Sequence, residues 1–376
     1  MGITGIICEY NPLHLGHKKQ LDLLKAQEKD VVCLMSGNFV QRGAPAIVDK
    51  MARAEAAVRC GADLVLELPV TAALSSAEGF AAEGVRILSG FCDSLCFGAE
   101  TADEKLLMEL ASALLSPKFP EHLRAELDKG LSFPVARTAA LEAMGLDAAL
   151  LNTPNNILAV EYCKAILAQN SPMKPMPILR QGSYHDTLPD AENPSATALR
   201  AMMPEGNWLD YIPAEAHAPL SAAPIHTLAA GERAMLCKLR TMVDAEFEVL
   251  PYGSEGLWHK LMRAARTETT LEAVACAVKS KRYTRTRIDR MILCAFLVLT
   301  AADLATPSPY ARVLAFNDRG REILKKAREN GHFPNIGEKV DHPYQMIEDR
   351  CDALYGLFAA DAPESPTPKY RVRYVP

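Results

Sequence analysis

The sequence predicts an α/β protein built on a doubly wound parallel sheet, with a helical insertion and a helical C-terminal domain. In the first two hundred residues, apolar runs of strand length alternate with helical patterns, as in a parallel sheet covered by helices. The stretch 117–169 and most of the chain beyond residue 200 show helical patterns alone. Because 376 residues exceed one ordinary core, we expect either two domains or one domain with a large helical appendage. The division expected is 1–200, with the insertion, and 201–376.

The expected elements of the first domain alternate between strand and helix. Strands are expected over Ile3–Cys8, Val31–Ser36, Leu64–Leu68, Ser94–Gly98 and Met176–Leu179. Helices are expected over Gly16–Gln27, Asp49–Cys60, Ser76–Leu88 and Asp103–Leu115, with Asp49 as an N-cap. The insertion at 117–169 is punctuated by four prolines, Pro117, Pro120, Pro134 and Pro154.

The second domain is expected to be mostly helical. The Pro- and Ala-rich segment Pro204–Pro224 predicts a linker along the surface, and helices should follow to about Gly356. The apolar run Met291–Leu299 is about half of the ~20 residues that a membrane span requires, so we expect a buried helix there. The Pro-rich tail beyond Gly356 should be either disordered or an extended arm.

Composition indicates a soluble globular protein. Hydrophobic residues make up 49% and charged residues 23%, without a long polar block. The N-terminus lacks the pattern of a signal peptide, so a cytoplasmic location without membrane attachment is expected. The ten cysteines lie mostly in apolar segments and should be reduced. Cys92 and Cys96 form a CxxxC pair, but nothing nearby completes a zinc set, so we expect core packing and no metal site.

Charge is distributed unevenly along the chain. The net charge of −5 argues against a general nucleic-acid binder, but residues 255–290 hold nine Lys or Arg against four acids. This local +5 leaves about −10 on the rest of the chain, an asymmetry that indicates a polyanion-binding lobe. Salt-bridged helix charges are the alternative interpretation. The candidates for RNA contact are Lys279, Lys281, Arg282, Tyr283, Arg285 and Arg287, with Tyr283 available for base stacking.

The strongest chemical signal lies where the first strand ends and the first helix begins, in the segment EYNPLHLGHKKQ. His14 and His17 are three residues apart on one helix face, and Gly16 between them allows a nucleotide to approach the backbone. Two imidazoles at a helix N-terminus can donate hydrogen bonds to phosphate oxygens as charge builds on them during attack at the α-phosphorus. A zinc pair or ordinary surface histidines are the alternatives. The structural context favours the catalytic interpretation.

A second phosphate-binding signal follows the last expected strand, in the segment NPSATALRAM. Ser195 and Thr197 stand at a predicted helix N-terminus, and Arg200 lies one turn further on the same face. This arrangement suits the distal phosphates of a nucleotide. An ordinary capped helix explains the same residues equally well.

The HxGH motif at the first βα turn resembles the nucleotidyltransferase superfamily, which includes the class I aminoacyl-tRNA synthetases; SATALR is similar to the SxTxxR phosphate loop of that superfamily. Seven segments, in order along nearly the whole chain, resemble the tRNA(Met) cytidine acetate ligase family. They are SGNFVQRGAPAIVDKMARAEAAVRCGADLVLELP, FGAE, TPNNILAVEY, LRQGSYHD, SATALR, KRYTRTRIDRMIL and VLAFNDRGREIL.

This resemblance implies an ATP-dependent ligase. The family activates acetate as acetyl-adenylate with release of pyrophosphate, then acetylates N4 of the wobble cytidine of elongator tRNA(Met), giving N4-acetylcytidine. ATP is then a co-substrate, with Mg²⁺ expected beside it, and acetate and elongator tRNA(Met) are the partners. The implied nucleotide contacts are Ile7, Cys8, Glu9, Tyr10, Asn11, Pro12, Leu13, His14, Leu15, Gly16, His17, Lys18, Lys19, Gln20, Gly98, Asn155, Arg180, Ser195, Thr197 and Arg200.

Several of these contacts have structural alternatives. Gly98 is either an open approach for the nucleoside or a simple turn glycine. One of Asn155 and Asn156 should cap the helix they open, and the resemblance favours Asn155 as the ligand contact. Arg180, directly after a strand, is well placed for phosphate, whereas Lys18 and Lys19 could be solvated helix charges.

The remaining substrate candidates are Asn38, Gln41, Arg42 and His185. The first three follow the second strand and could bind acetate or the tRNA end, although Asn38 and Gly43 could simply shape a turn. His185, next to Asp186, could orient substrate or act on the N4 amine proton. The main alternative function is a small-molecule adenylyltransferase of the same superfamily, against which the long basic second half argues. The oligomeric state is not predicted.

Overall fold

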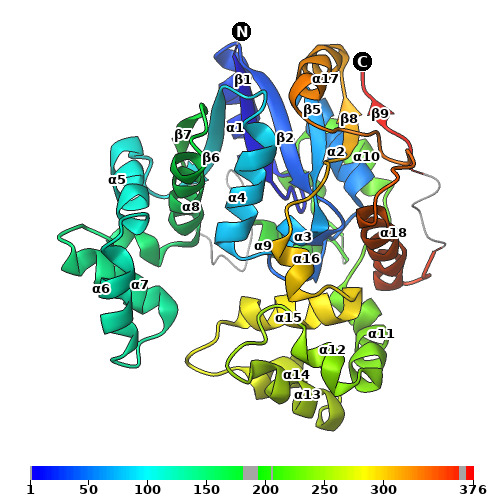
Figure 1. The fold of residues 1–376 in the computed structure, drawn as a ribbon. Helices are drawn as coiled ribbons and strands as arrows, with labels where there is room; N and C mark the ends of the chain where they lie inside the picture. Colours follow the sequence, from blue (N-terminus) through cyan, green and yellow to red (C-terminus); the bar gives the residue numbers. More distant parts are fainter. Residues whose placement is uncertain (1, 181–193, 205, 364–369) are drawn as a thin grey trace.

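A seven-stranded sheet occupies the centre of the computed structural model, which describes residues 2–180, 194–204, 206–363 and 370–376 (Figure 1). The strand order is β7-β6-β1-β2-β5-β8-β9. The strands are β1 (Ile3–Cys8), β2 (Asp30–Ser36), β5 (Leu64–Leu68), β6 (Ser94–Ala99), β7 (Lys174–Leu179), β8 (Val313–Phe316) and β9 (Arg373–Tyr374). All five expected strands are present, and they pair in parallel, which confirms the doubly wound sheet.

The winding of the sheet reverses between β1 and β6. From β1 the chain moves outward to β2 and then β5, and it returns to form β6 and β7 on the opposite side of β1. In an open α/β sheet, a reversal of this kind leaves a crevice at the carboxyl ends of the two strands, where ligands bind. The segment with the HxGH motif leaves the end of β1 and therefore enters this crevice.

Helices cover both faces of the sheet. Alternate residues of each strand point to opposite faces, so Val32 and Leu34 of β2 join one core while Val31 and Cys33 join the other. The first core is covered by α4 (Ala77–Leu88), α5 (Glu104–Leu114), α8 (Pro154–Ala168) and α17 (Asp318–Asn330). The second is covered by α1 (Leu15–Ala26), α2 (Lys50–Arg59) and α10 (Ala214–Ser221). As expected, the Asp49 carboxylate caps α2, accepting from the N–H groups of Met51 and Ala52.

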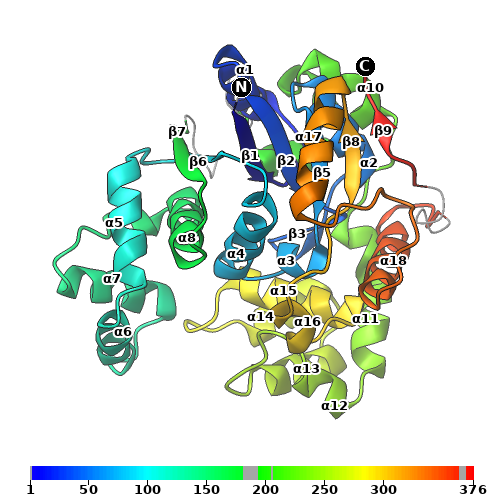
Figure 2. The same cartoon turned by 45° about the horizontal axis from the view of Figure 1, so that its top comes forward.

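The stretch 117–169 is helical, as expected, but it does not form one separate insertion. It contains α6 (Phe119–Leu127), α7 (Phe133–Ala143), the 3-10 turn η1 (Ala149–Asn152) and α8. Helix α8 is buried against the sheet through Ala159, Cys163 and Ile166, because it is the crossover that returns the chain to β7. Helices α6 and α7 stand away from the sheet beyond α5 (Figure 2).

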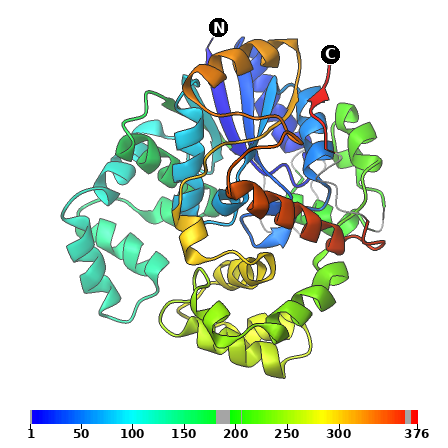
Figure 3. The same cartoon turned by 45° about the vertical axis from the view of Figure 1, so that its right-hand side comes forward.

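A helical lobe lies beyond the carboxyl ends of the strands, with its own apolar core (Figure 1). It consists of α11 (Leu228–Thr241), α12 (Asp244–Glu248), α13 (Leu257–Thr267), α14 (Leu271–Val278), α15 (Arg285–Leu297) and α16 (Ala301–Ala305). The residues of α15 from Met291 onward are buried, which confirms the buried helix expected there. Helix α18 (Tyr344–Tyr355) and the turn η3 (Gly356–Phe358) lie between this lobe and the sheet (Figure 3).

Short elements complete the fold. They are the hairpin strands β3 (Phe39–Val40) and β4 (Ala44–Pro45), helix α3 (Val70–Ala73), helix α9 (Ala196–Met202) and the turn η2 (Leu209–Tyr211). No helix in the described part of the chain is long and apolar enough to cross a membrane. All ten cysteines are free thiols, and Cys92 and Cys96 are buried in the core, as expected.

Two expectations about the second half were wrong. The segment around Pro204–Pro224 is no plain linker, because Trp208, Ile212, Ala216 and Leu220 recur every four residues and pack α10 against α2. The second half also supplies β8, antiparallel to β5, and β9 at the sheet edge. These strands span four and two residues, too few for a strand period to emerge from the sequence. The sheet thus draws on both sides of the boundary expected at residue 200, and the described end of the tail forms an extended arm.

Candidate active site

A cavity of about 570 Å³ opens at the crevice between β1 and β6. Seven segments line it: the end of β1 with the start of α1, the loop between β3 and β4, the start of α4, the end of β6, the start of α8, the end of β7, and the start of α9. Apolar groups, among them Phe80, Phe97 and Tyr162, form one part of the wall. Among the residues that the structure describes, four cationic side chains, Lys19, Arg42, Arg180 and Arg200, also line the cavity, against one carboxylate, Glu9. A ligand with an apolar ring and several negative charges fits such a wall.

His14 and His17 stand together at the start of α1. His14 is the N-cap, and its Nδ1 accepts from the Gly16 N–H at 3.1 Å. The Nδ1 of His17 accepts in turn from the His14 N–H at 3.3 Å, and the two rings stack with their centroids 3.7 Å apart. A Cβ at position 16 would lie 3.0 Å from Cε1 of His14, so Gly16 allows that ring to fold against the backbone.

These contacts fix the tautomer of both rings. Since each Nδ1 accepts a hydrogen bond, each neutral imidazole carries its proton on Nε2. Burial, then Arg180 and Arg200, lower the pKa of His14 to about 3; burial, then His14 and Arg180, lower the pKa of His17. The Nε2 of His14 is buried and meets no hydrogen-bond partner within the described residues. Both side chains line the cavity, so the pair presents neutral N–H donors to a ligand.

We expect His14 to stay neutral across the physiological pH range. In nucleotide-free protein its ring proton signals should not titrate between about pH 5 and 8, whereas in denaturant they should move with a midpoint near the ordinary histidine pKa of 6.5. As pH falls from about 6.5 towards 3, His14 binds a proton in the unfolded chain but not in the folded one. Protonation therefore favours the unfolded chain, and the lowered pKa makes the fold less stable in acid. The measurement is an NMR titration, and a midpoint near 6.5 in the folded protein would refute the assignment.

The start of α9 faces the same cavity. Ser195 is the N-cap and accepts from the Ala198 N–H at 3.1 Å, so the helix is capped as its sequence predicts. Arg200 donates from Nη1 to the Asn11 carbonyl at 2.8 Å and from Nη2 to Thr197 Oγ1 at 3.1 Å. Arg200 therefore ties α9 to the turn that carries the histidines, and Ser195, Thr197 and Arg200 all line the cavity.

The ends of β6 and β7 form the opposite wall. A Cβ at Gly98 would meet no atom of the described residues within 4 Å, so their packing does not require this glycine. Asn155 donates from Nδ2 to Glu100 Oε1 at 2.6 Å and accepts from Arg180 Nη1 at 3.3 Å. All three predicted contacts, Gly98, Asn155 and Arg180, line the cavity.

Asn156 has a structural role instead. It is buried, and its Oδ1 accepts from the Thr101 N–H at 2.9 Å. The expectation that one of the two asparagines caps α8 was wrong, because Thr153 is the N-cap residue. Sequence reasoning missed Glu100, whose carboxylate accepts from Asn155 and from the Asn156 N–H. The signal available was a carboxylate directly after a strand, in FGAE.

The predicted stretch from Ile7 to Gln20 is only partly at the cavity. Most of its residues line the wall, and Pro12, Leu13, Leu15 and Lys18 do not. Leu13 is fully buried in the core below. Lys18 pairs with Asp22 and Glu215 on the helix surface, as its alternative interpretation expected.

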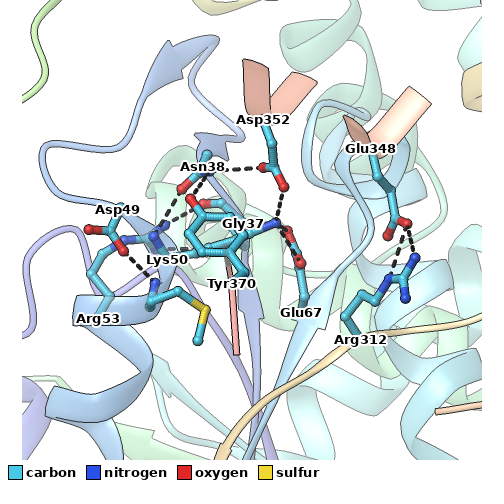
Figure 4. A network of polar contacts seen from close by, with 12 residues as sticks. Gly37, Asn38, Asp49, Lys50, Arg53, Glu67, Arg312, Glu348, Asp352 and Tyr370 are labelled. Carbon is cyan, nitrogen blue, oxygen red and sulfur yellow. Dashed lines mark hydrogen bonds and ion pairs between the residues drawn. The ribbon is translucent and has the colours of Figure 1, made fainter. Parts of the chain in front are cut away.

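The candidates after β2 separate into two groups. Gln41 and Arg42 line the cavity. Asn38 does not, and its assignment to substrate was wrong, because its side chain belongs to a buried polar network (Figure 4). Its Oδ1 accepts from the Lys50 N–H at 2.9 Å, and its Nδ2 donates to Asp352 Oδ1 at 2.9 Å. His185, with Asp186, lies outside the described residues.

The basic segment is more paired than its composition indicated. Arg285 pairs with Glu272 and Asp289, and Arg282 pairs with Glu255 at 3.3 Å, as the salt-bridge interpretation expected. Arg287 donates to the Tyr252 carbonyl. Tyr283 is buried and donates to Glu255 Oε2 at 2.8 Å, so its ring is not available for base stacking, and that expectation was wrong. Lys279, Lys281 and Arg282 remain exposed to solvent.

The fold, the stacked imidazole pair and the cationic cavity define a nucleotidyl transferase of the HIGH class. The sequence profile of the HIGH Nucleotidyl Transferase family accordingly matches residues 1–365. A protein named tRNA(Met) cytidine acetate ligase in Clostridium novyi is 37% identical to this chain, over 89% of each. One of the same name in Clostridium perfringens is 38% identical over 90% of each. The chain belongs to the tRNA(Met) cytidine acetate ligase family.

Solved structures agree with this membership. The apo crystal structure of Thermotoga maritima TmcAL superposes with a TM-score of 0.91 at 30% identity and covers 100% of both chains. The same protein bound with alpha-thio ATP gives a TM-score of 0.89, covering 100% of this chain and 99% of that one. The expected family and fold class are therefore confirmed.

Proposed function

We propose that this chain is an ATP-dependent acetate ligase that acetylates N4 of the wobble cytidine of elongator tRNA(Met). In the first step a carboxylate oxygen of acetate attacks the α-phosphorus of ATP, which forms acetyl-adenylate and releases pyrophosphate. In the second step the N4 amine attacks the acyl carbon, AMP leaves, and the amine loses a proton, giving N4-acetylcytidine. The names of the relatives support both the ligase class and tRNA(Met) as substrate.

The observation that carries this proposal is the pair of neutral imidazoles with their protons on Nε2. Negative charge grows on the phosphoryl oxygens during attack, and fixed N–H donors in a site shielded from water stabilise that charge. Donors that are already fixed in place need no reorganisation as this charge develops. His14 and His17 are therefore the proposed catalytic residues.

The remaining wall residues divide according to the parts of ATP. Gly98, Asn155 and Arg180 would hold the nucleoside and α-phosphate, and Ser195, Thr197 and Arg200 the distal phosphates. Mg²⁺ would be held mainly by the phosphates. Among the described residues that line the cavity Glu9 is the sole carboxylate, and no set of three or more His, Cys, Asp or Glu in the described chain could hold a metal. The adenylyl transfer to a small molecule considered above is not favoured, since the relatives match along almost the full chain.

The activation step can be tested alone by measuring pyrophosphate release. Release should require both ATP and acetate, and it should occur without tRNA. Propionate should support slower release, because one additional methylene changes binding by only ~1–3 kcal/mol. Release with phosphate monoesters but not with acetate would contradict the proposal.

The tRNA surface is proposed to include the exposed cations Lys279, Lys281 and Arg282, in the cytoplasm where tRNA is modified. Reversing all three to Glu should weaken tRNA binding and reduce its salt dependence by up to about one unit of slope for each lost phosphate contact. Acetate-dependent pyrophosphate release should survive. Filter binding against salt concentration measures both quantities, and an unchanged slope would place the RNA surface elsewhere.

A further inference from the structure

The loop between β3 and β4 connects the helical lobe to the active-site cavity. Arg290 of α15 donates from Nη1 to the Gln41 carbonyl at 3.1 Å. Gly43 has a φ of +81°, and a Cβ there would lie 2.4 Å from the Arg290 nitrogen and 2.5 Å from the Asp289 carbonyl carbon. The loop thus packs directly against the backbone of α15, whose first turn carries Arg285 and Arg287 of the basic segment.

On its other side the same loop is tied to the end of β1. The Gln41 N–H donates to Glu9 Oε1 at 2.9 Å, and Glu9 is five residues before His14. The main chain of Gln41 is therefore held from the lobe by Arg290 and from the histidine turn by Glu9. The guanidinium of Arg290 is itself held over the ring of Tyr252, 4.9 Å from its centroid.

The side chain of Gln41 is not used by these contacts. Gln41 lines the cavity, and its Nε2 is buried without a hydrogen-bond partner among the residues that the structure describes. A buried amide N–H without a partner is costly, so such a donor in a ligand cavity indicates an acceptor on the ligand. Two amide protons suit a carboxylate oxygen.

The sheet order indicates which part of the substrate lies there. Gly98, Asn155 and Arg180 belong to the β6 and β7 side of the crevice, whereas Gln41 and Arg42 follow β2 on the other side of β1. If the nucleoside occupies the first side, the acyl group meets the α-phosphate from the second. The placement of the acyl group beside Gln41 rests on the function proposed above.

We propose that Arg290 is a positioning residue for acid activation. By holding the Gln41 carbonyl from the helical lobe, it directs the Gln41 amide towards the carboxylate of the short-chain acid that attacks ATP. Arg290 itself touches no reacting atom. Its loss should therefore weaken the apparent affinity for the acid and leave the nucleotide side unchanged.

The test is the kinetics of acetate-dependent pyrophosphate release in five single variants and one double variant. Arg290→Ala should raise KM for acetate roughly 10-fold, as for loss of one charge-assisted hydrogen bond, while KM for ATP stays within about 2-fold. Arg290→Lys keeps one cationic donor and should fall between Arg290→Ala and the unmodified protein. Gly43→Ala places a methyl group against the backbone of α15 and so displaces the loop from the helix. It should also raise KM for acetate and leave KM for ATP within about 2-fold. The matched control is Arg350→Ala, which removes an arginine bound to the carbonyls of Leu297 and Val298 at the far end of α15 and should change neither KM.

The decisive comparison is a double-mutant cycle with Gln41→Ala, because Arg290 is argued to act through Gln41. Arg290→Ala should then add nothing to the KM for acetate in the Gln41→Ala background. An equal rise in both backgrounds, or no rise in either, would overturn the positioning role while acetate-dependent release by the unmodified protein leaves the proposed function standing. Absence of that release from the unmodified protein would overturn both. Thermal melting of each variant shows whether the fold is intact.

Discussion

Replacing His17 with alanine should lower acetate-dependent pyrophosphate release by about 10²–10³-fold, the usual loss on removing one transition-state donor. The variant loses the Nε2–H donor at the cavity, and it also loses the Nδ1 acceptor that orients the His14 N–H. Because the effect is on the transition state, kcat should fall much more than KM for ATP rises. Steady-state kinetics at saturating acetate measure both parameters.

A matched histidine provides the control for this variant. His342 accepts the Tyr344 N–H through Nδ1 at 3.0 Å, much as His14 accepts the Gly16 N–H, but it lies outside the cavity. His342→Ala should therefore keep full activity. The His17→Ala protein should melt near the same temperature as the unmodified chain. Full activity in His17→Ala, or loss of the fold, would make the catalytic assignment wrong.

Replacing Lys50 with methionine should destabilise the protein by about 3–5 kcal/mol, the typical cost of breaking a buried ion pair from one side. Lys50 is 2% exposed and donates to both oxygens of Glu67 at 2.8 and 3.0 Å and to Asp352 Oδ2 at 2.8 Å (Figure 4). Burial opposes its charge, but Asp352 and Glu67 hold the pKa of Lys50 well above its usual value. Without the ammonium, two carboxylates remain buried and lose the cation that balances their charge.

The pH dependence identifies the cause of that loss. In the variant the Glu67 carboxyl can avoid its charge by binding a proton, since burial already raises the pKa of Glu67 to about 7 in the intact protein. A folded-state pKa above the unfolded value favours the fold as pH falls, so the deficit should be smaller at about pH 5.5 than at about pH 7.5. Urea unfolding at the two pH values measures it. Lys325→Met, at an exposed pair with Glu322, should leave stability unchanged, and an equal deficit at both pH values for Lys50→Met would contradict the charge explanation.

Local signals in the sequence were enough to predict the first half of the fold and the position of His14 and His17 within it. The signals for each strand and the helix that follows it lie in neighbouring residues. Asp49, for example, directly precedes an apolar helix pattern and caps that helix. His14 and His17 are close in sequence, so their placement at the end of β1 followed from one strand and one helix. Their resemblance to a known motif supplied the chemistry.

Contacts between distant segments could not be predicted in the same way. Asn38 looked like a cavity residue because it follows a strand, yet its partner Asp352 stands 314 residues away. Tyr283 looked exposed within a basic run, but the packing of the helical lobe buries it. The contact of Arg290 with Gln41 spans 249 residues and depends on how the lobe meets the sheet. No period or motif encodes such contacts, since they arise only when segments far apart in the sequence pack together.

The most direct measurement of the central claim is the nucleoside content of tRNA treated with this protein. Elongator tRNA(Met), isotopically labelled acetate and ATP should be incubated with the chain, and the digested nucleosides should be separated by mass spectrometry. The function proposed here predicts labelled N4-acetylcytidine, dependent on ATP and absent with His17→Ala or with tRNA whose wobble cytidine is replaced by uridine. Unmodified cytidine in the complete reaction, with acetate-dependent pyrophosphate release intact, would show that the activated acyl group has a different acceptor.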